Sequence, residues 1–105
     1  MKNYIIILCT TNSKDSAETI ATYIIKENLA ACVNIIPKIT SIYKWENKIE
    51  KDEEFLMLIK TKKDLFNKVK EKIKIIHPYE VPEIISVEIS EGNTDYLKWI
   101  NNITI

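Results

Sequence analysis

Two side chains in this sequence have the chemistry to bind a soft metal ion. Cys9 ends the apolar run at residues 4–9, and His77 is the only histidine in the chain. Thiolate sulfur and imidazole nitrogen are ligands that copper prefers. Two ligands from one chain do not complete a tetrahedral or square-planar shell, so Glu80 or a neighbouring subunit would have to supply the others. The alternative is a structural role, with Cys9 as a small buried apolar side chain and His77 as a cation at a helix C-terminus.

Three further groups of residues have both a functional and a structural interpretation. The carboxylates of residues 50–54 would attract hard cations, although an acidic edge strand more often prevents aggregation (Glu50, Asp52, Glu53 and Glu54). Three aromatic side chains would line a pocket between subunits, although aromatic residues at helical spacing usually belong to a core (Tyr79, Tyr96 and Trp99). Cys32 is interpreted as a packing residue, because it lies in the opposite phase from Val33 and Ile35.

No group of residues has the pattern of a catalytic centre. The chain has no second histidine to form an acid–base pair, and no nucleophile, base and orienting residue at a recognisable spacing. Its single glycine, Gly92, leaves no glycine-rich loop to bind a phosphate. We therefore do not expect an enzyme.

The composition is that of one small domain, covering residues 1–105, which is 46% hydrophobic and 29% charged. Fifteen basic and fifteen acidic residues cancel, which argues against nucleic acid and against an anionic membrane surface as partners. No apolar stretch is long enough to span a bilayer, and the short N-terminal run is typical of a strand and not of a signal peptide. Two cysteines without framework spacing indicate a reducing compartment, so we expect a cytoplasmic protein.

One long β-hairpin is predicted over residues 30–61. Apolar residues alternate along both arms, with Val33, Ile35, Ile39, Tyr43 and Trp45 in one phase of the first arm. Glu46-Asn47 is the predicted turn and Pro37 marks a predicted bulge. Each arm has about 15 residues and would extend roughly 50 Å, whereas a compact domain of this size is roughly 33 Å across. The tip should therefore project, and its apolar residues should contact a partner (Ile42, Tyr43, Trp45 and Ile49).

The remaining patterns place the hairpin within an α+β fold. An apolar strand at residues 4–9 precedes a helix, which Asn12 or Ser13 would cap and Asn28 would end. After the hairpin, Thr61 and Asp64 would form a capping box for a second helix, which Pro78 stops. A strand at 84–89 and a short helix follow. This order of strand, helix, two hairpin strands, helix and strand is the ferredoxin-like βαββαβ pattern, with an antiparallel sheet and a short C-terminal helix.

Five stretches of the sequence occur in the order found in a known family. They are LAACVNIIP at 29–37, SIYKWENKIE at 41–50, IKT at 59–61, HPYEVPEII at 77–85 and GNTDYLKWI at 92–100. Together they resemble the CutA family, the divalent-cation tolerance proteins, and the match covers nearly the whole chain. Asn47 is a departure, because the family usually has glycine in this turn, but Asn is tolerated at positive φ.

The resemblance implies a tight homotrimer with hairpins that cross between subunits, the same architecture as the PII signalling trimers. It also implies a link to copper and other divalent cations. Cys9 and His77 match positions proposed in the family to contact copper, whereas Ile76 stands where some members have a second histidine. A copper site in this chain would therefore have modest affinity.

The expected function is that of a trimeric divalent-cation tolerance protein that binds copper or another divalent ion. One alternative is a small-ligand signalling trimer of the PII kind, although a chain without arginine lacks bidentate phosphate recognition. Another alternative is a structural protein whose trimer anchors a partner and has no role with metal.

Overall fold

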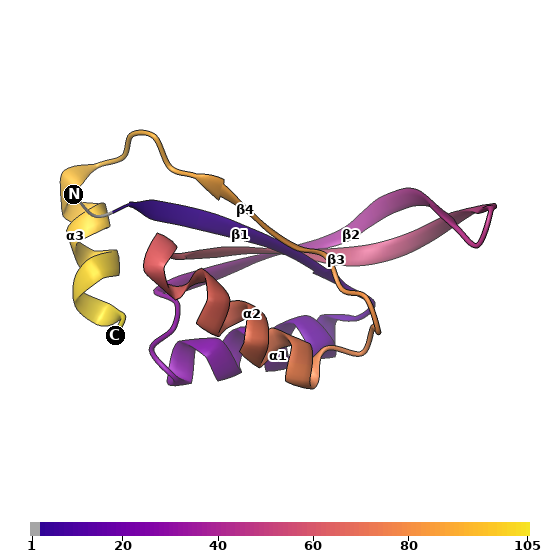
Figure 1. Cartoon of the computed structure of the whole chain (residues 1–105), viewed down its shortest axis with the longest axis horizontal. Coiled ribbons are helices and arrows are strands. Elements are labelled where there is room, and N and C mark those ends of the chain that lie inside the picture. The colour runs from indigo at the N-terminus through magenta and orange to yellow at the C-terminus, as the bar shows by residue number, and fades with distance from the viewer. Residues whose placement is uncertain (1–2) are drawn as a thin grey trace.

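The computed structural model describes residues 3–105 as a four-stranded sheet with two helices packed on one face (Figure 1). The strands lie in the order β2-β3-β1-β4, and every neighbouring pair is antiparallel. This is the predicted ferredoxin-like arrangement. The elements in chain order are β1 Tyr4–Thr11, α1 Lys14–Lys26, β2 Cys32–Trp45, β3 Lys48–Lys62, a 3-10 turn Lys63–Leu65, α2 Phe66–Ile76, β4 Ile84–Glu88 and α3 Thr94–Ile103.

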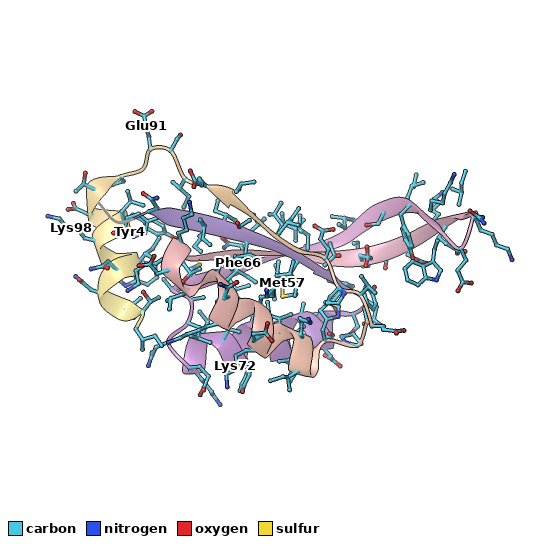
Figure 2. The ribbon with its side chains drawn as sticks, viewed as in Figure 1. Tyr4, Met57, Phe66, Lys72, Glu91 and Lys98 are labelled. Carbon is cyan, nitrogen blue, oxygen red and sulfur yellow. The ribbon has the colours of Figure 1, made fainter. Side chains whose placement is uncertain are left out.

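The core lies between the sheet and helices α1 and α2. Successive side chains of a strand point to opposite faces of its sheet, so one phase of β1 and one phase of β3 point to the helices. Those residues are almost fully buried, and Figure 2 shows Met57 between the two layers (Ile5, Ile7, Cys9, Met57 and Ile59). Apolar residues at helical spacing complete the core from α1 and α2 (Ala17, Ile20, Ile24, Val69 and Ile73).

The helix ends follow from local chemistry, with one exception. The Ser13 side chain accepts a hydrogen bond from the backbone N–H of Ser16 and caps α1, and Asn28 follows the helix at φ 59°. The predicted capping box at Thr61 is wrong, because no side chain caps α2. Thr61 is instead the second-last residue of β3 and is fully buried. Its hydroxyl donates a hydrogen bond to the backbone carbonyl of Leu29, 2.6 Å away.

The predicted hairpin forms, with its turn and bulge where expected. Glu46 and Asn47 both have positive φ, as a tight two-residue turn requires. The pairing register shifts between Ile36 and Ile39, at the position of Pro37. This bulge corrects the predicted phase: Ile35 pairs with Met57 on the helix face, whereas Ile39 pairs with Glu54 on the other face.

The bulge also divides the apolar residues of the tip between two faces. Tyr43 pairs with Glu50, so Tyr43 and Trp45 lie on the side away from the helices. Ile42 pairs with Lys51 and lies on the opposite side, as does Ile49.

The tip of the hairpin projects beyond the rest of the sheet (Figure 1). The strand β1 ends at Thr11, opposite Phe55, and beyond that point β2 and β3 pair only with each other. The molecule is accordingly 44 Å long but only 26 Å by 22 Å in its other dimensions. Ile42, Tyr43, Trp45 and Ile49 on this ribbon are between 42% and 78% exposed.

The face of the sheet away from α1 and α2 is apolar, and α3 lies at one end of the sheet, where Nζ of Lys60 in β3 approaches the Tyr96 ring (Figure 1). Ile36, Ile85 and Val87 are 41%, 53% and 49% exposed there. Their register neighbours on this face are half-buried (Ile6, Leu8, Leu56 and Leu58). We refer to these seven residues as the open face.

The helices of residues 3–105 are too short or too polar for any of them to cross a bilayer.

Candidate functional site

Cys9 and His77 meet at one backbone oxygen, although 67 residues separate Thr10 from His77. The Cys9 thiol points to the carbonyl of Thr10 at 3.9 Å, and Nε2 of His77 lies 2.7 Å from the same oxygen. The end of β1 positions the thiol. Pro78 stops α2 at Ile76, and His77 then adopts an extended backbone (φ −73°, ψ 137°) that turns its ring towards β1.

Both ring nitrogens of His77 are occupied. A carbonyl oxygen only accepts hydrogen bonds, so Nε2 carries the proton that it donates to Thr10. Nδ1 then accepts a hydrogen bond from the backbone N–H of Tyr79, 3.0 Å away. A metal ion that binds either nitrogen must therefore replace one of these two hydrogen bonds.

Burial sets the protonation of both groups. Burial, followed by the nearby charges of Glu83 and Glu54, raises the pKa of the Cys9 thiol to about 12. Burial also lowers the pKa of His77, while the hydrogen bond to Thr10 and the charge of Glu54 partly oppose that shift. At neutral pH the pair is therefore a protonated thiol beside a neutral imidazole, which is not a nucleophile activated by a base.

A buried carboxylate lies beside this pair. Glu54 is only 6% exposed, and one of its oxygens accepts a 2.7 Å hydrogen bond from the hydroxyl of Tyr79. Burial and this hydrogen bond raise the pKa of Tyr79. Burial, followed by the charge of Glu54, raises the pKa of Glu83. The segment 77–83 thus carries His77, Tyr79 and Glu83 to the end of β1, beside the root of the hairpin.

A cavity of about 650 Å³ lies between this segment and the hairpin, and we refer to it as the root pocket. The Tyr43 hydroxyl donates to the carboxylate of Asp52 in its wall. Its lining comes from the end of β1, from both arms of the hairpin and from the segment 77–83 (Thr10, Ser41, Ile42, Tyr43, Trp45, Asp52, Glu54, Tyr79, Glu80, Val81 and Glu83).

The structure unites some of the predicted site residues and separates others. Cys9 and His77 are neighbours, and Glu80 is exposed at the edge of the root pocket. No three histidine, cysteine or carboxylate side chains of residues 3–105 are arranged to hold a metal ion. Tyr79 lies in the root pocket, whereas Tyr96 and Trp99 lie in α3, at the end of the sheet far from the hairpin tip (Figure 1). Within one chain these three aromatic residues do not form a common pocket.

Sequence analysis named Glu54 only as one of four neighbouring carboxylates, and it did not name Glu83 as a site residue. Glu54 belongs to an acidic run in which Glu50 and Asp52 are much more exposed, and only the bulge and the end of β1 distinguish it. Within the sheet β3 lies between β2 and β1, but this acidic run lies beyond the last β1–β3 pair, Thr11 with Phe55, and pairs only with β2. The sequence signal for Glu83 was its position at the end of the stiff segment 77–83, directly after Pro82 and before β4.

Comparison with known proteins finds relatives that match nearly the whole chain. The family model described as CutA1 divalent ion tolerance protein matches residues 5–103. The divalent-cation tolerance protein CutA of Thermus thermophilus is 48% identical over 99 residues, covering 94% of this chain and 96% of that protein. Protein CutA of Homo sapiens is 44% identical over 95 residues, which are 90% of this chain but only 53% of that longer protein.

Solved structures of CutA1 proteins also superpose closely on this chain. The structure of CutA1 from Oryza sativa is 43% identical and superposes with a TM-score of 0.96, covering 98% of this chain and 94% of that one. The Thermus thermophilus structure gives a TM-score of 0.94 at 46% identity, covering 96% of this chain and 98% of that one. The chain therefore belongs to the CutA1 family of divalent ion tolerance proteins.

Proposed function

We propose that this chain works as a homotrimer that binds divalent cations, since the name of its family connects it with tolerance of divalent ions. Copper is proposed among these cations because Cys9 and His77 offer the sulfur and nitrogen ligands that it prefers. Both cysteines are free thiols, which supports a reducing compartment such as the cytoplasm. The role is binding and not catalysis, because the thiol beside His77 is protonated and the imidazole has no free nitrogen.

The observation that carries the trimer is the open face together with the projecting hairpin. The open face places seven aliphatic side chains on a sheet that its own helices leave uncovered. Exposed apolar patches of this kind mark interaction surfaces, and burial on a second copy would stabilise them by roughly 25 cal/mol for each Å². The hairpin tip is long enough to reach past the edge of its own sheet to a neighbouring copy. In a closed ring of three copies, the same repeated contact would bury both the open face and the hairpin tip of every copy.

We expect a solution mass of about 37 kDa by light scattering at micromolar concentration, three times the 12.3 kDa of one chain. The reason is that the apolar residues of the open face and of the tip are exposed or only half-buried in the single chain. A measured mass of 12.3 kDa, that of one chain, would show that the protein is not a trimer and would contradict this part of the proposed function.

The proposed cation site is built from Cys9 and His77, with Glu80 as the third side chain. The thiol and Nε2 of His77 both donate to the carbonyl of Thr10, so a soft ion that displaces the thiol proton and shifts the imidazole proton to Nδ1 would have sulfur and nitrogen ligands in one place. Glu80 lies three residues after His77, exposed at the edge of the root pocket, and would have to move towards the pair to become the third ligand. Ile76 supplies no ligand, which limits the affinity.

Replacing Cys9 with alanine and His77 with glutamine should weaken binding of copper(I), added without oxygen, by more than about 100-fold, because it removes both ligands. Glutamine keeps a donor for the carbonyl of Thr10. Binding to the parent protein must displace the thiol proton, since the pKa of Cys9 is raised to about 12. Its apparent affinity should therefore rise about tenfold for each pH unit between pH 7 and 9.

Titration calorimetry of the reduced protein measures both effects, and zinc serves as a divalent ion without redox chemistry. The matched control is Cys32→Ala, which removes the other free thiol. Equal copper affinity in the parent and in the double variant would show that the ion binds elsewhere.

A small-ligand signalling role is the second candidate, and the root pocket favours it. Its volume of about 650 Å³ lies within the range of small-molecule sites. Its lining contains four carboxylates and no lysine, so a nucleotide or another phosphate ligand does not suit it.

A further inference from the structure

The two hydrogen bonds of His77 differ in how they oppose a bound cation. A cation binds an imidazole nitrogen through its lone pair, so that nitrogen must carry no proton. If Nε2 binds, its proton moves to Nδ1, and the backbone N–H of Tyr79 then faces another N–H across 3.0 Å. If Nδ1 binds, the cation takes the place of the Tyr79 N–H. The bond to Thr10 can remain in the second case, whereas the Tyr79 N–H has to leave His77 in both cases.

The side chain of Tyr79 holds this N–H in place. Its hydroxyl donates a 2.7 Å hydrogen bond to the carboxylate of Glu54, which is only 6% exposed. Its ring lies 4.9 Å from the ring of His77, centroid to centroid, at an interplanar angle of 59°. Pro78, between the two, has a fixed φ. Tyr79 is therefore held at its backbone, its ring and its hydroxyl, and the bond to a charged acceptor is the strongest of these contacts.

The segment around Tyr79 has few other attachments to the fold. Residues 78–82 belong to no helix or strand, and they make no backbone–backbone hydrogen bond to another residue of 3–105. The segment is attached at its two ends, by the end of α2 and the start of β4. Regions with few such bonds open at a lower free energy than the core does. The bond between Tyr79 and Glu54 therefore decides how readily the middle of this segment moves.

We propose that Tyr79 is a positioning residue of the cation site, whose hydroxyl bond to Glu54 keeps its backbone N–H on Nδ1 and so keeps His77 closed to cations. This role rests on the proposed cation site, but its contacts all lie within one chain and none of them needs an open pocket. Binding then has two requirements. The segment 78–82 moves until the Tyr79 N–H leaves Nδ1, and Cys9 releases its thiol proton to solvent. The imidazole releases no proton, because its single N–H proton stays on the nitrogen that the cation does not bind.

Amide hydrogen exchange of the full protein tests the positioning without any metal. The variant is Tyr79→Phe, which keeps the ring and removes only the hydroxyl. The amide of residue 79 should exchange about tenfold faster than in the parent, because a bond to a charged acceptor no longer resists opening. Amides of β1 and β3 should keep their rates and serve as the internal reference. The NMR signal of Nδ1 reports the same release, and its assignment is unambiguous because His77 is the only histidine.

Titration with copper(I), in the absence of oxygen, tests the consequence for binding. Tyr79→Phe should bind copper(I) about tenfold more tightly than the parent, since binding no longer has to break the bond to Glu54. Glu54→Gln keeps an acceptor for the Tyr79 hydroxyl and should change the exchange rate and the affinity by less than about threefold. The matched control is Tyr23→Phe, which removes a tyrosine hydroxyl from α1 and should change neither.

Faster exchange at residue 79 together with tighter copper binding supports the proposal. Unchanged exchange in Tyr79→Phe would overturn it, and so would unchanged or weaker copper binding at Cys9 and His77, because Tyr79 would then not close the site. A change in Glu54→Gln as large as that in Tyr79→Phe would also overturn it, since the charge of Glu54 would then be the cause. If copper binds equally to the parent and to the Cys9→Ala, His77→Gln variant, the proposed function fails instead, and the exchange rate alone decides whether Tyr79 positions its N–H.

Discussion

Replacing Trp45 with glutamate should dissociate the assembly and lower the melting temperature of the protein. Trp45 lies next to the hairpin turn and is 50% exposed in the single chain. Burying an apolar side chain of this size contributes roughly 1.5–3 kcal/mol, and a closed ring repeats the contact in each copy. A carboxylate at the same contact would have to be desolvated without a partner, which adds a further cost. Light scattering and thermal unfolding, both at one fixed protein concentration, measure the two effects.

Two controls separate a contact from a general surface effect. Trp45→Phe keeps an aromatic ring and should retain the assembly. Thr22→Glu places the same single charge on the exposed side of α1, and should leave the mass and the melting temperature nearly unchanged. An unchanged mass and melting temperature in Trp45→Glu would show that the tip does not contact a neighbouring copy.

Replacing Ile7 with alanine should destabilise the fold by about 2–5 kcal/mol. Ile7 has no exposed surface and lies in β1, where it pairs with Ile59 of β3 and belongs to the core under α1 and α2. Its truncation loses apolar burial and leaves a cavity that the strands on either side of β1 cannot close. Denaturant unfolding at a fixed concentration measures the loss.

The graded control is Ile7→Val, which removes a single methylene and should cost about 0.5–1.5 kcal/mol. Ile75→Ala is the surface control, because Ile75 is 72% exposed on α2. A loss in Ile7→Ala no greater than that in Ile75→Ala would mean that β1 is not the centre of the core.

The features of the fold that could be predicted are those that one or two residues determine. Asn47 tolerates positive φ, Pro37 cannot donate to a ladder, and Pro78 disfavours a helical His77, so the turn, the bulge and the end of α2 were predicted correctly. The face of each residue beyond the bulge could not be predicted. One extra residue in β2 reverses the alternation, and only the pairing with β3 shows where that reversal occurs.

The candidate site shows the same division. Cys9 and His77 attracted notice through their ligand chemistry, and the structure brings both to the carbonyl of Thr10. The burial of Glu54 could not be predicted, because it depends on where β1 ends and on the path of a segment more than twenty residues further along the chain. Likewise, the resemblance implied copper ligands, but only the coordinates show that hydrogen bonds occupy both nitrogens of His77.

Tyr79 connects the two proposed sites, because its backbone N–H binds Nδ1 of His77 while its hydroxyl binds Glu54. Any event that rotates the imidazole therefore also changes the support of the buried carboxylate. Coupling between two binding sites is reciprocal, whether one ligand strengthens or weakens the binding of the other. If a metal ion at His77 changes the affinity of the root pocket for a small ligand, that ligand must change the affinity for the metal by the same factor. The occupancy of each site would then depend on the concentrations of both ligands.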